Sequence, residues 1–158
     1  MEIVRLFQIM EKHQASDLHV KAGQPPIFRV AGQLSRMQNT APLTDEQTRS
    51  LLDPLFTDRT RKQLAERGNA DFSWFDDEVG RYRCNIYQQR GFLSAAIRRV
   101  NRQIPTYEEL RLPAHIGQIA DFTQGLVLIG GVTGSGKSTT LASMLNDING
   151  KRRCHILT

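Results

Sequence analysis

The stretch Leu126–Leu141 reads LVLIGGVTGSGKSTTL, and the rest of the chain can be interpreted outward from it. It runs from four apolar residues through a glycine-rich turn into spacing typical of an amphipathic helix. Inside it, Gly131–Ser138 fits the pattern G-x-x-x-x-G-K-[ST], which is typical of loops that bind phosphate between a buried strand and a helix. The order of these parts predicts a parallel sheet with a phosphate-binding loop at the end of one strand.

Each residue type in this loop suits an anion site. Glycine adopts backbone conformations that a Cβ disfavours, so successive N–H groups can surround a phosphate, and a helix that begins near Lys137 adds the positive end of its dipole. Lys137 is expected to reach the β- and γ-phosphates of ATP, and the Ser138 hydroxyl is expected to bind Mg²⁺. A plain glycine turn with a solvated lysine is the weaker alternative. The candidate nucleotide-binding residues are Gly131, Thr133, Gly134, Ser135, Gly136, Lys137, Ser138 and Thr139.

The composition is that of an ordinary globular protein. The 158 residues carry a net charge of +5, but the basic residues are scattered and are not interleaved with aromatic residues, which argues against nucleic-acid binding. Cys84 and Cys154 are too few for a disulfide framework, and the four histidines show no metal-ligand spacing. No apolar run has the length of a membrane span and the N-terminus lacks a signal-peptide core, so we expect a cytoplasmic protein.

The first 100 residues predict an α+β domain in which helices cover one face of an antiparallel sheet. Capping residues and apolar spacing indicate the helices. The strands are indicated by alternating apolar and polar residues in segments that are bounded by turns with Gly or Pro. In one strand Tyr82, Cys84 and Ile86 share a face, opposite Arg81 and Arg83. The predicted helices span residues 2–13 and 45–56 and begin again at a cap on Asp58, and the predicted strands include residues 18–20, 27–30, 34–37, 70–75, 81–88 and 92–100.

Residues 101–112 resemble a linker, and residues 113–158 resemble the start of a doubly wound α/β domain. Two strands and one long helix cannot cover both faces of a sheet, and no strand with a terminal acidic residue follows the loop. We therefore expect a part of a longer ATPase that, alone, binds nucleotide weakly and does not hydrolyse it. The expected elements are a short helix around residues 116–120, strands at 126–129 and 154–158, and a helix that ends at Asn149-Gly150.

Further stretches resemble the secretion-superfamily ATPases, and among them the type IV pilus retraction ATPases of twitching motility. The resemblance runs through the whole chain in order, which makes it more specific than the loop alone. Within the loop, Val132 stands where this family usually has proline, and the change leaves the backbone donors in place. The matching stretches are Ala15–Val20 with Gly23 and Pro25-Pro26, Arg81–Asn85 with Arg90-Gly91 and Ile97-Arg98, Pro105–Leu110, Gly125–Leu128, the loop with Ser138–Ala142, and His155–Thr158.

The resemblance implies a PAS-like N-terminal domain (1–100), the linker (101–112) and the start of a RecA-like P-loop ATPase domain (113–158). It implies a homohexamer that binds ATP and Mg²⁺, meets a pilus platform protein at the inner face of the cytoplasmic membrane, and powers retraction by ATP hydrolysis. The family's catalytic glutamate has no matching position here. Two alternatives remain: a non-catalytic nucleotide-binding module, and a pilus extension or type II secretion ATPase, which usually has a longer N-terminal region.

The resemblance also implies that arginines of the N-terminal domain approach the nucleotide phosphates. The matching positions are Arg81, Arg83 and Arg98. Arg83 and Arg98 are expected on adjacent strands, where they could converge on a γ-phosphate and act as transition-state arginines. The alternative is that these arginines simply face solvent, and for Arg81 that alternative is favoured.

Overall fold

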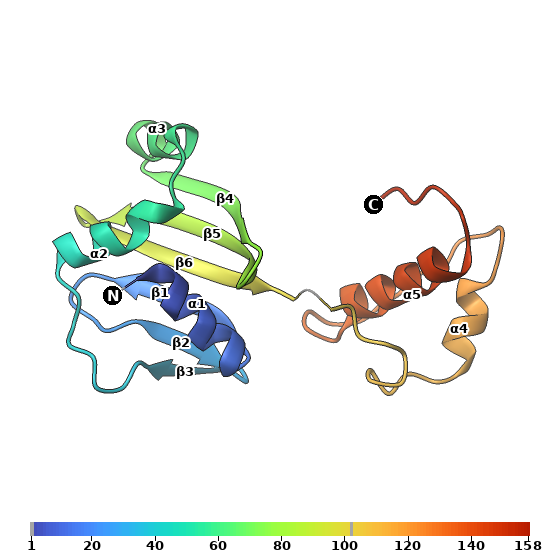
Figure 1. The fold of residues 1–158 in the computed structure, drawn as a ribbon. Coiled ribbons are helices and arrows are strands. Elements are labelled where there is room, and N and C mark those ends of the chain that lie inside the picture. The colour runs from blue at the N-terminus through green and yellow to red at the C-terminus, as the bar shows by residue number, and fades with distance from the viewer. Residues whose placement is uncertain (1, 102) are drawn as a thin grey trace. The chain divides into compact units, whose positions relative to one another are not determined.

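The computed structural model describes residues 2–101 and 103–158, and the chain divides into two compact units, residues 1–102 and 103–158 (Figure 1). Residues 1 and 102 lie outside the described residues, so the predicted N-terminal domain and the predicted linker are each covered except for one position. The first unit holds an antiparallel sheet with helices, and the described part of the second unit holds two helices.

The first unit is built on a six-stranded sheet. Its strands are β1 (Ala15–Lys21), β2 (Ile27–Val30), β3 (Gln33–Arg36), β4 (Asn69–Asp76), β5 (Gly80–Gln89) and β6 (Phe92–Val100). Their order is β3-β2-β1-β6-β5-β4, and all neighbouring strands are antiparallel. The strands predicted at 27–30 and 34–37 pair as a hairpin, and those predicted at 70–75, 81–88 and 92–100 pair in sequence order as a meander. They join through β1 and β6, two strands far apart in the sequence, so that Asp17 lies opposite Arg98.

One face of this sheet carries the hydrophobic core. The helices α1 (Ile3–Lys12) and α2 (Asp45–Leu52) bury their apolar side chains against it, together with the predicted inward residues Tyr82, Cys84 and Ile86. At its centre the ring of Phe7 stacks on Tyr82 with 4.0 Å between ring centroids. The Tyr82 hydroxyl donates to the carbonyl of Val79 at 2.9 Å, so its polar end is satisfied although the side chain is buried. The polar residues of the same strands therefore lie on the other face.

The predicted helix at 45–56 is confirmed in its first two turns and tightens at its end. Thr44 and Gln47 form a capping box, in which each side chain accepts a hydrogen bond from the backbone N–H of the other residue. After α2 the chain continues as the 3₁₀ turn Asp53–Leu55, because Pro54 has no N–H to continue the α-helical hydrogen bonds.

The cap predicted for the next helix is shifted by one residue. In α3 (Asp58–Arg67) the cap is Thr57, whose hydroxyl accepts from the backbone N–H of Thr60, whereas Asp58 is already helical. Thr57 has the extended backbone of a cap, and a carboxylate in the first turn still interacts favourably with the helix dipole. Gly68 ends the helix in the left-handed conformation that glycine adopts readily.

The second unit has helices where they are expected but not strands. Its helices are α4 (His115–Ala120) and α5 (Lys137–Lys151). The prediction of strands at residues 126–129 and 154–158 is wrong for this structure, because neither segment pairs with another strand among the described residues. A strand exists only by hydrogen bonding to a neighbour, whereas a helix satisfies its own backbone.

The end of α5 also differs from the prediction. Asn149-Gly150 does not break the helix, which continues to Lys151 and closes with a bond from the Arg152 N–H to the Ile148 carbonyl at 2.8 Å. Glycine inside a helix costs about 1 kcal/mol relative to alanine, so it weakens a helix without ending it.

The described residues contain no helix that is both long enough and apolar enough to cross a membrane. Across residues 2–101 and 103–158, histidine, cysteine and acidic side chains nowhere gather in the groups of three that a metal ion would need.

Candidate functional site

The loop Gly131–Ser138 runs directly into the N-terminus of α5. Gly136 is the residue before the helix and adopts the left-handed conformation with φ 89°. At Gly131, where φ is 156°, an added Cβ would lie 2.7 Å from Oγ of Ser135, so only glycine fits there without movement. The glycines therefore let the loop fold tightly against the first turn of the helix.

Lys137 is held over this loop. Its Nζ donates to the carbonyl of Val132 at 2.8 Å, and the N–H of Ser135 donates to the same carbonyl at 3.2 Å. The ammonium group is thus fixed on the loop by a neutral carbonyl acceptor. A phosphate oxygen is a stronger acceptor for this cation than a neutral carbonyl, because both partners are then charged.

The other predicted binding residues surround the same turn. Thr133, Ser138 and Thr139 are exposed, and Ser138 and Thr139 lie in the first turn of α5. No hydrogen bond within the described part of the chain engages the Ser138 hydroxyl, so this oxygen is available to Mg²⁺, which prefers oxygen ligands. Val132 is 79% exposed, so the residue that replaces the family's proline does not fill the loop.

The predicted arginines lie on the sheet of the first unit, on the face opposite the core. Arg83 on β5 and Arg98 on β6 are direct cross-strand partners, which confirms that they lie on adjacent strands. Arg81 lies two residues before Arg83 and has its guanidinium 5.8 Å from the ring centre of Phe75. Cross-strand side chains are about 4.5–5.5 Å apart at Cβ, so the charges of Arg83 and Arg98 repel each other unless anions compensate them.

Two aspartates supply that compensation. Oδ1 of Asp17 accepts a hydrogen bond from Nε of Arg98 at 2.9 Å, and Asp71 accepts from Nε of Arg83 at 3.4 Å. Asp17 also accepts from the Ser16 hydroxyl at 2.8 Å and forms an ion pair with Arg29 at 3.4 Å. Sequence reasoning missed both aspartates as site residues. The alternation of β1, which places Asp17 on the polar face, was the signal that could have found the first.

The electrostatics of Asp17 follow from these partners. Burial raises its pKa, but the hydrogen bonds from Arg98 and Ser16 and the charges of Arg98 and Arg29 outweigh that effect. The pKa of Asp17 is therefore below its usual value, and the carboxylate is ionised at neutral pH.

A shallow hollow of about 230 Å³ opens between the two arginines. Its floor includes Ala96, whose small side chain leaves room above the strand, and the side-chain amide of Asn85 adds a neutral hydrogen-bond donor. The remaining lining residues are Asp17, Asp71, Arg83, Ile97 and Arg98. The hollow is therefore lined by two guanidinium groups and by the two carboxylates that pair with them, beside one neutral amide.

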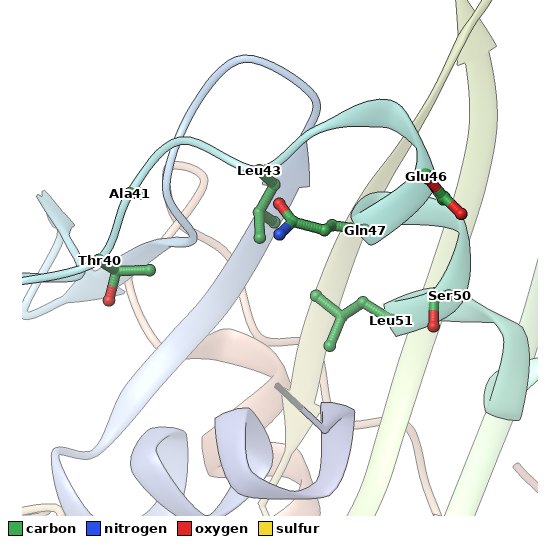
Figure 2. A pocket seen from close by; sticks show the side chains of 7 residues that line it. All are labelled: Thr40, Ala41, Leu43, Glu46, Gln47, Ser50 and Leu51. Carbon is green, nitrogen blue, oxygen red and sulfur yellow. The ribbon is translucent and has the colours of Figure 1, made fainter.

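A larger hollow of about 500 Å³ lies between the segment before α2 and α2 itself (Figure 2). Leu43 and Gln47 lie close together in it, while the side chains of Glu46 and Ser50 point away from them. The side-chain oxygen Oε1 of Gln47 already accepts a hydrogen bond from the backbone N–H of Thr44 in the α2 cap. This hollow shows no gathering of charge that would indicate a ligand.

Comparison with known proteins adds the family. Residues 95–158 match the Type II/IV secretion system protein family. The chain is 40% identical over 158 residues to the type IV pilus retraction ATPase PilT of Pseudomonas aeruginosa and spans 46% of it. It is 35% identical to the type IV pilus ATPase PilU of the same bacterium and spans 41% of it. A crystal structure of the retraction motor PilT with bound ADP matches with a TM-score of 0.83 at 38% identity, over 94% of this chain and 43% of that one.

Residues 95–158 are thus similar to the type II/IV secretion system protein family, and the antiparallel fold of the first unit matches that of the PilT structure. The chain is PilT-like along its whole length. It spans less than half the length of PilT and PilU.

Proposed function

We propose that this chain is the ATP-binding part of a hexameric motor ATPase that powers type IV pilus retraction and thereby twitching motility. One observation carries the proposal: the glycine loop Gly131–Ser138 opens helix α5 within a sequence that is PilT-like throughout. In this proposal the first unit is a PAS-like domain, residues 101–112 are its linker, and residues 113–158 begin a RecA-like P-loop domain.

On nucleotide binding, the hydrogen bond from Lys137 to the Val132 carbonyl would be replaced by stronger, charge-assisted bonds to phosphate. Lys137 leaves the Val132 carbonyl and binds the β- and γ-phosphate oxygens, while the loop N–H groups and Thr139 contact the inner phosphates. The Ser138 hydroxyl ligates Mg²⁺, which when bound neutralises part of the phosphate charge. The residues assigned to this site are Gly131, Thr133, Gly134, Ser135, Gly136, Lys137, Ser138 and Thr139.

In the same proposal Arg83 and Arg98 bind the terminal phosphate of ATP, whichever copy of the chain holds the nucleotide. This role is supported by the cross-strand pairing of the two arginines and by the hollow between them. A guanidinium group can bind two phosphate oxygens at once. Arg81 is assigned to the surface, where Phe75 lies against it.

The partners of the proposed motor are other copies of the chain, in a hexamer, and the pilus platform protein at the inner face of the cytoplasmic membrane. Hydrolysis belongs to the assembled ATPase. The 158-residue chain alone is expected to bind nucleotide weakly and to show no turnover. ATP hydrolysis by the purified chain that a Lys137 substitution abolishes would contradict this expectation.

Nucleotide binding is tested by the affinity of the full-length gene product for a non-hydrolysable ATP analogue. Lys137→Ala should weaken binding about 10- to 100-fold, because it removes a charge-assisted contact to phosphate worth about 1.5–3 kcal/mol. Lys151→Ala is the matched control, since Lys151 lies at the other end of α5 and pairs with Asp147. Equal affinities of the wild type and Lys137→Ala would refute the proposed site.

The direction of pilus movement needs a separate test in cells. Deletion of the gene should abolish twitching while pili accumulate on the surface, because extension continues without retraction. Loss of surface pili instead would favour the extension ATPase.

A further inference from the structure

Arg83, Arg98 and Asp17 form a charged row across β5, β6 and β1 on the sheet face opposite the core. Asp17 is the best-fixed member of this row. Its side chain is 13% exposed, whereas that of Arg98 is 73% exposed, so the carboxylate is the anchored partner of this pair. Both carboxylate oxygens are engaged, Oδ1 by Arg98 and Oδ2 by Ser16 and Arg29. The carboxylate therefore has a defined position from which it can orient a mobile arginine.

The geometry of the contact matters more than its strength. Asp17 binds Arg98 through Nε, at the side of the guanidinium. Within residues 2–101 and 103–158, no hydrogen bond engages the two terminal amino groups of Arg98. Because the carboxylate binds at the side, the two terminal amino groups of the guanidinium stay accessible. These groups form the forked end that can bind two phosphate oxygens at once.

Asp17 also counteracts repulsion inside the row. Arg83 is the cross-strand neighbour of Arg98 on one side, and Asp17 is its cross-strand neighbour on the other. Without the carboxylate, the like charge of Arg83 would drive the Arg98 side chain away from the hollow that both arginines line.

From this arrangement we infer that Asp17 is a positioning residue: it fixes Arg98 side-on so that its free end receives the terminal phosphate of a nucleoside triphosphate. The inference rests on the proposed function of Arg98 and adds a residue to it. It concerns recognition of the third phosphate, so its signature is the preference for a triphosphate over a diphosphate.

The test compares affinities for a non-hydrolysable ATP analogue and for ADP in the full-length gene product. Asp17→Asn should lower the preference for the triphosphate about fivefold and leave the ADP affinity unchanged. Asp17→Glu, which keeps a carboxylate on a longer side chain, should restore part of the preference. Asp53→Asn is the matched control, because Asp53 forms a similar pair with Arg61 away from the hollow, and it should change nothing.

A double-mutant cycle separates positioning from a general structural effect. In an Arg98→Ala background, Asp17→Asn should have no further effect on the triphosphate preference, since the group that it positions is gone. An Asp17→Asn variant with unchanged or tighter triphosphate binding would overturn the inference and make Asp17 a simple counter-charge.

The two proposals fail in different ways. If Arg98→Ala keeps the full triphosphate preference, the role of Arg98 and the inference both fail, while nucleotide binding by the loop is judged by Lys137→Ala alone. If Arg98→Ala loses the preference and folded Asp17→Asn and Asp17→Glu do not, only the inference about Asp17 fails.

Discussion

In the first unit Phe7 and Tyr82 are 0% exposed, whereas in the second unit Leu126 and Leu128 are 82% and 83% exposed. All four belong to apolar patterns that predict buried structure. In the first unit, six paired strands form a sheet, and α1 and α2 cover one of its faces. In the second unit, the apolar run has no strand beside it among the described residues. An apolar pattern therefore predicts what a segment can bury, and the presence of neighbouring strands determines whether it does so.

The largest expected difference between the units is the response to loss of an apolar side chain. Phe7→Ala should lower the free energy of unfolding by about 3–5 kcal/mol, because it empties a stacked position in a close-packed core. Leu128→Ala, its counterpart in the second unit, should change this free energy by less than about 0.5 kcal/mol. Urea denaturation would measure both, followed by far-UV circular dichroism and by the fluorescence of Trp74, whose ring centre lies 5.1 Å from that of Phe7. Similar losses in the two variants would contradict the contrast in burial.

Two glycines should differ in the sign of a smaller effect. An added Cβ would meet nothing within 4 Å at either Gly68 or Gly150, so space is equal and only the backbone differs. Gly68 has φ 73°, so Gly68→Ala should destabilise the first unit by about 1–2 kcal/mol. Gly150 lies inside α5, so Gly150→Ala should stabilise that helix by up to about 1 kcal/mol. Hydrogen exchange of the backbone amides in each unit would measure the change in stability for both variants. A destabilised Gly150→Ala would show that the helix is not maintained there.

The smallest expected effect is the dependence of stability on pH. The first unit should lose stability at acidic pH and the second unit at alkaline pH. The pKa of Asp17 is lowered in the folded first unit, so its ion pairs stabilise the fold above the unfolded pKa of about 4 and this contribution is lost as pH falls through the lower folded value. The loss should be no more than about 1 kcal/mol, since Arg98 is largely exposed. Urea midpoints between neutral and acidic pH should show it in the wild type and not in Asp17→Asn.

In the second unit the corresponding group is Tyr107, whose hydroxyl donates to Asp147 at 3.2 Å. Burial, the nearby charge of Asp147 and this hydrogen bond raise the pKa of Tyr107 to about 12. A raised pKa means that the neutral phenol stabilises this unit below pH 10 and that the contribution is lost as pH rises through 12. Phenolate absorbance should show a late step from Tyr107, and Tyr107→Phe should remove that step.

The sequence was sufficient for the local structure of the first unit and not for its long-range pairing. Alternation predicts the buried face of β5, because successive side chains of a strand point to opposite sides. The adjacency of β1 and β6 joins residues about 80 positions apart, and no local signal reports such a contact. In the second unit the strand predictions are wrong for the same reason, since they depended on partners that a single segment cannot reveal.

The candidate site divides in the same way. The loop before α5 follows from a contiguous pattern of glycines and Lys137, so the sequence predicts its residues and the start of the helix. The opposition of Arg83 and Arg98 follows from one turn between adjacent strands. Asp17 reaches Arg98 only through the pairing of β1 with β6, so the alternation of β1 could place Asp17 on the polar face but could not identify Arg98 as its partner.

The position of β6 has a mechanical consequence. This strand lies between β1 and β5, with cross-strand partners on both sides, and it is the strand from which the chain leaves the first unit. On its covered face Arg99 binds Glu11 and Gln14 near the end of α1, at 2.8 and 2.9 Å. Tension applied beyond Val100 would act along the strand and shear two ladders of hydrogen bonds at once. A single-molecule experiment that pulls there should therefore need a higher force than one that pulls at the edge strand β3.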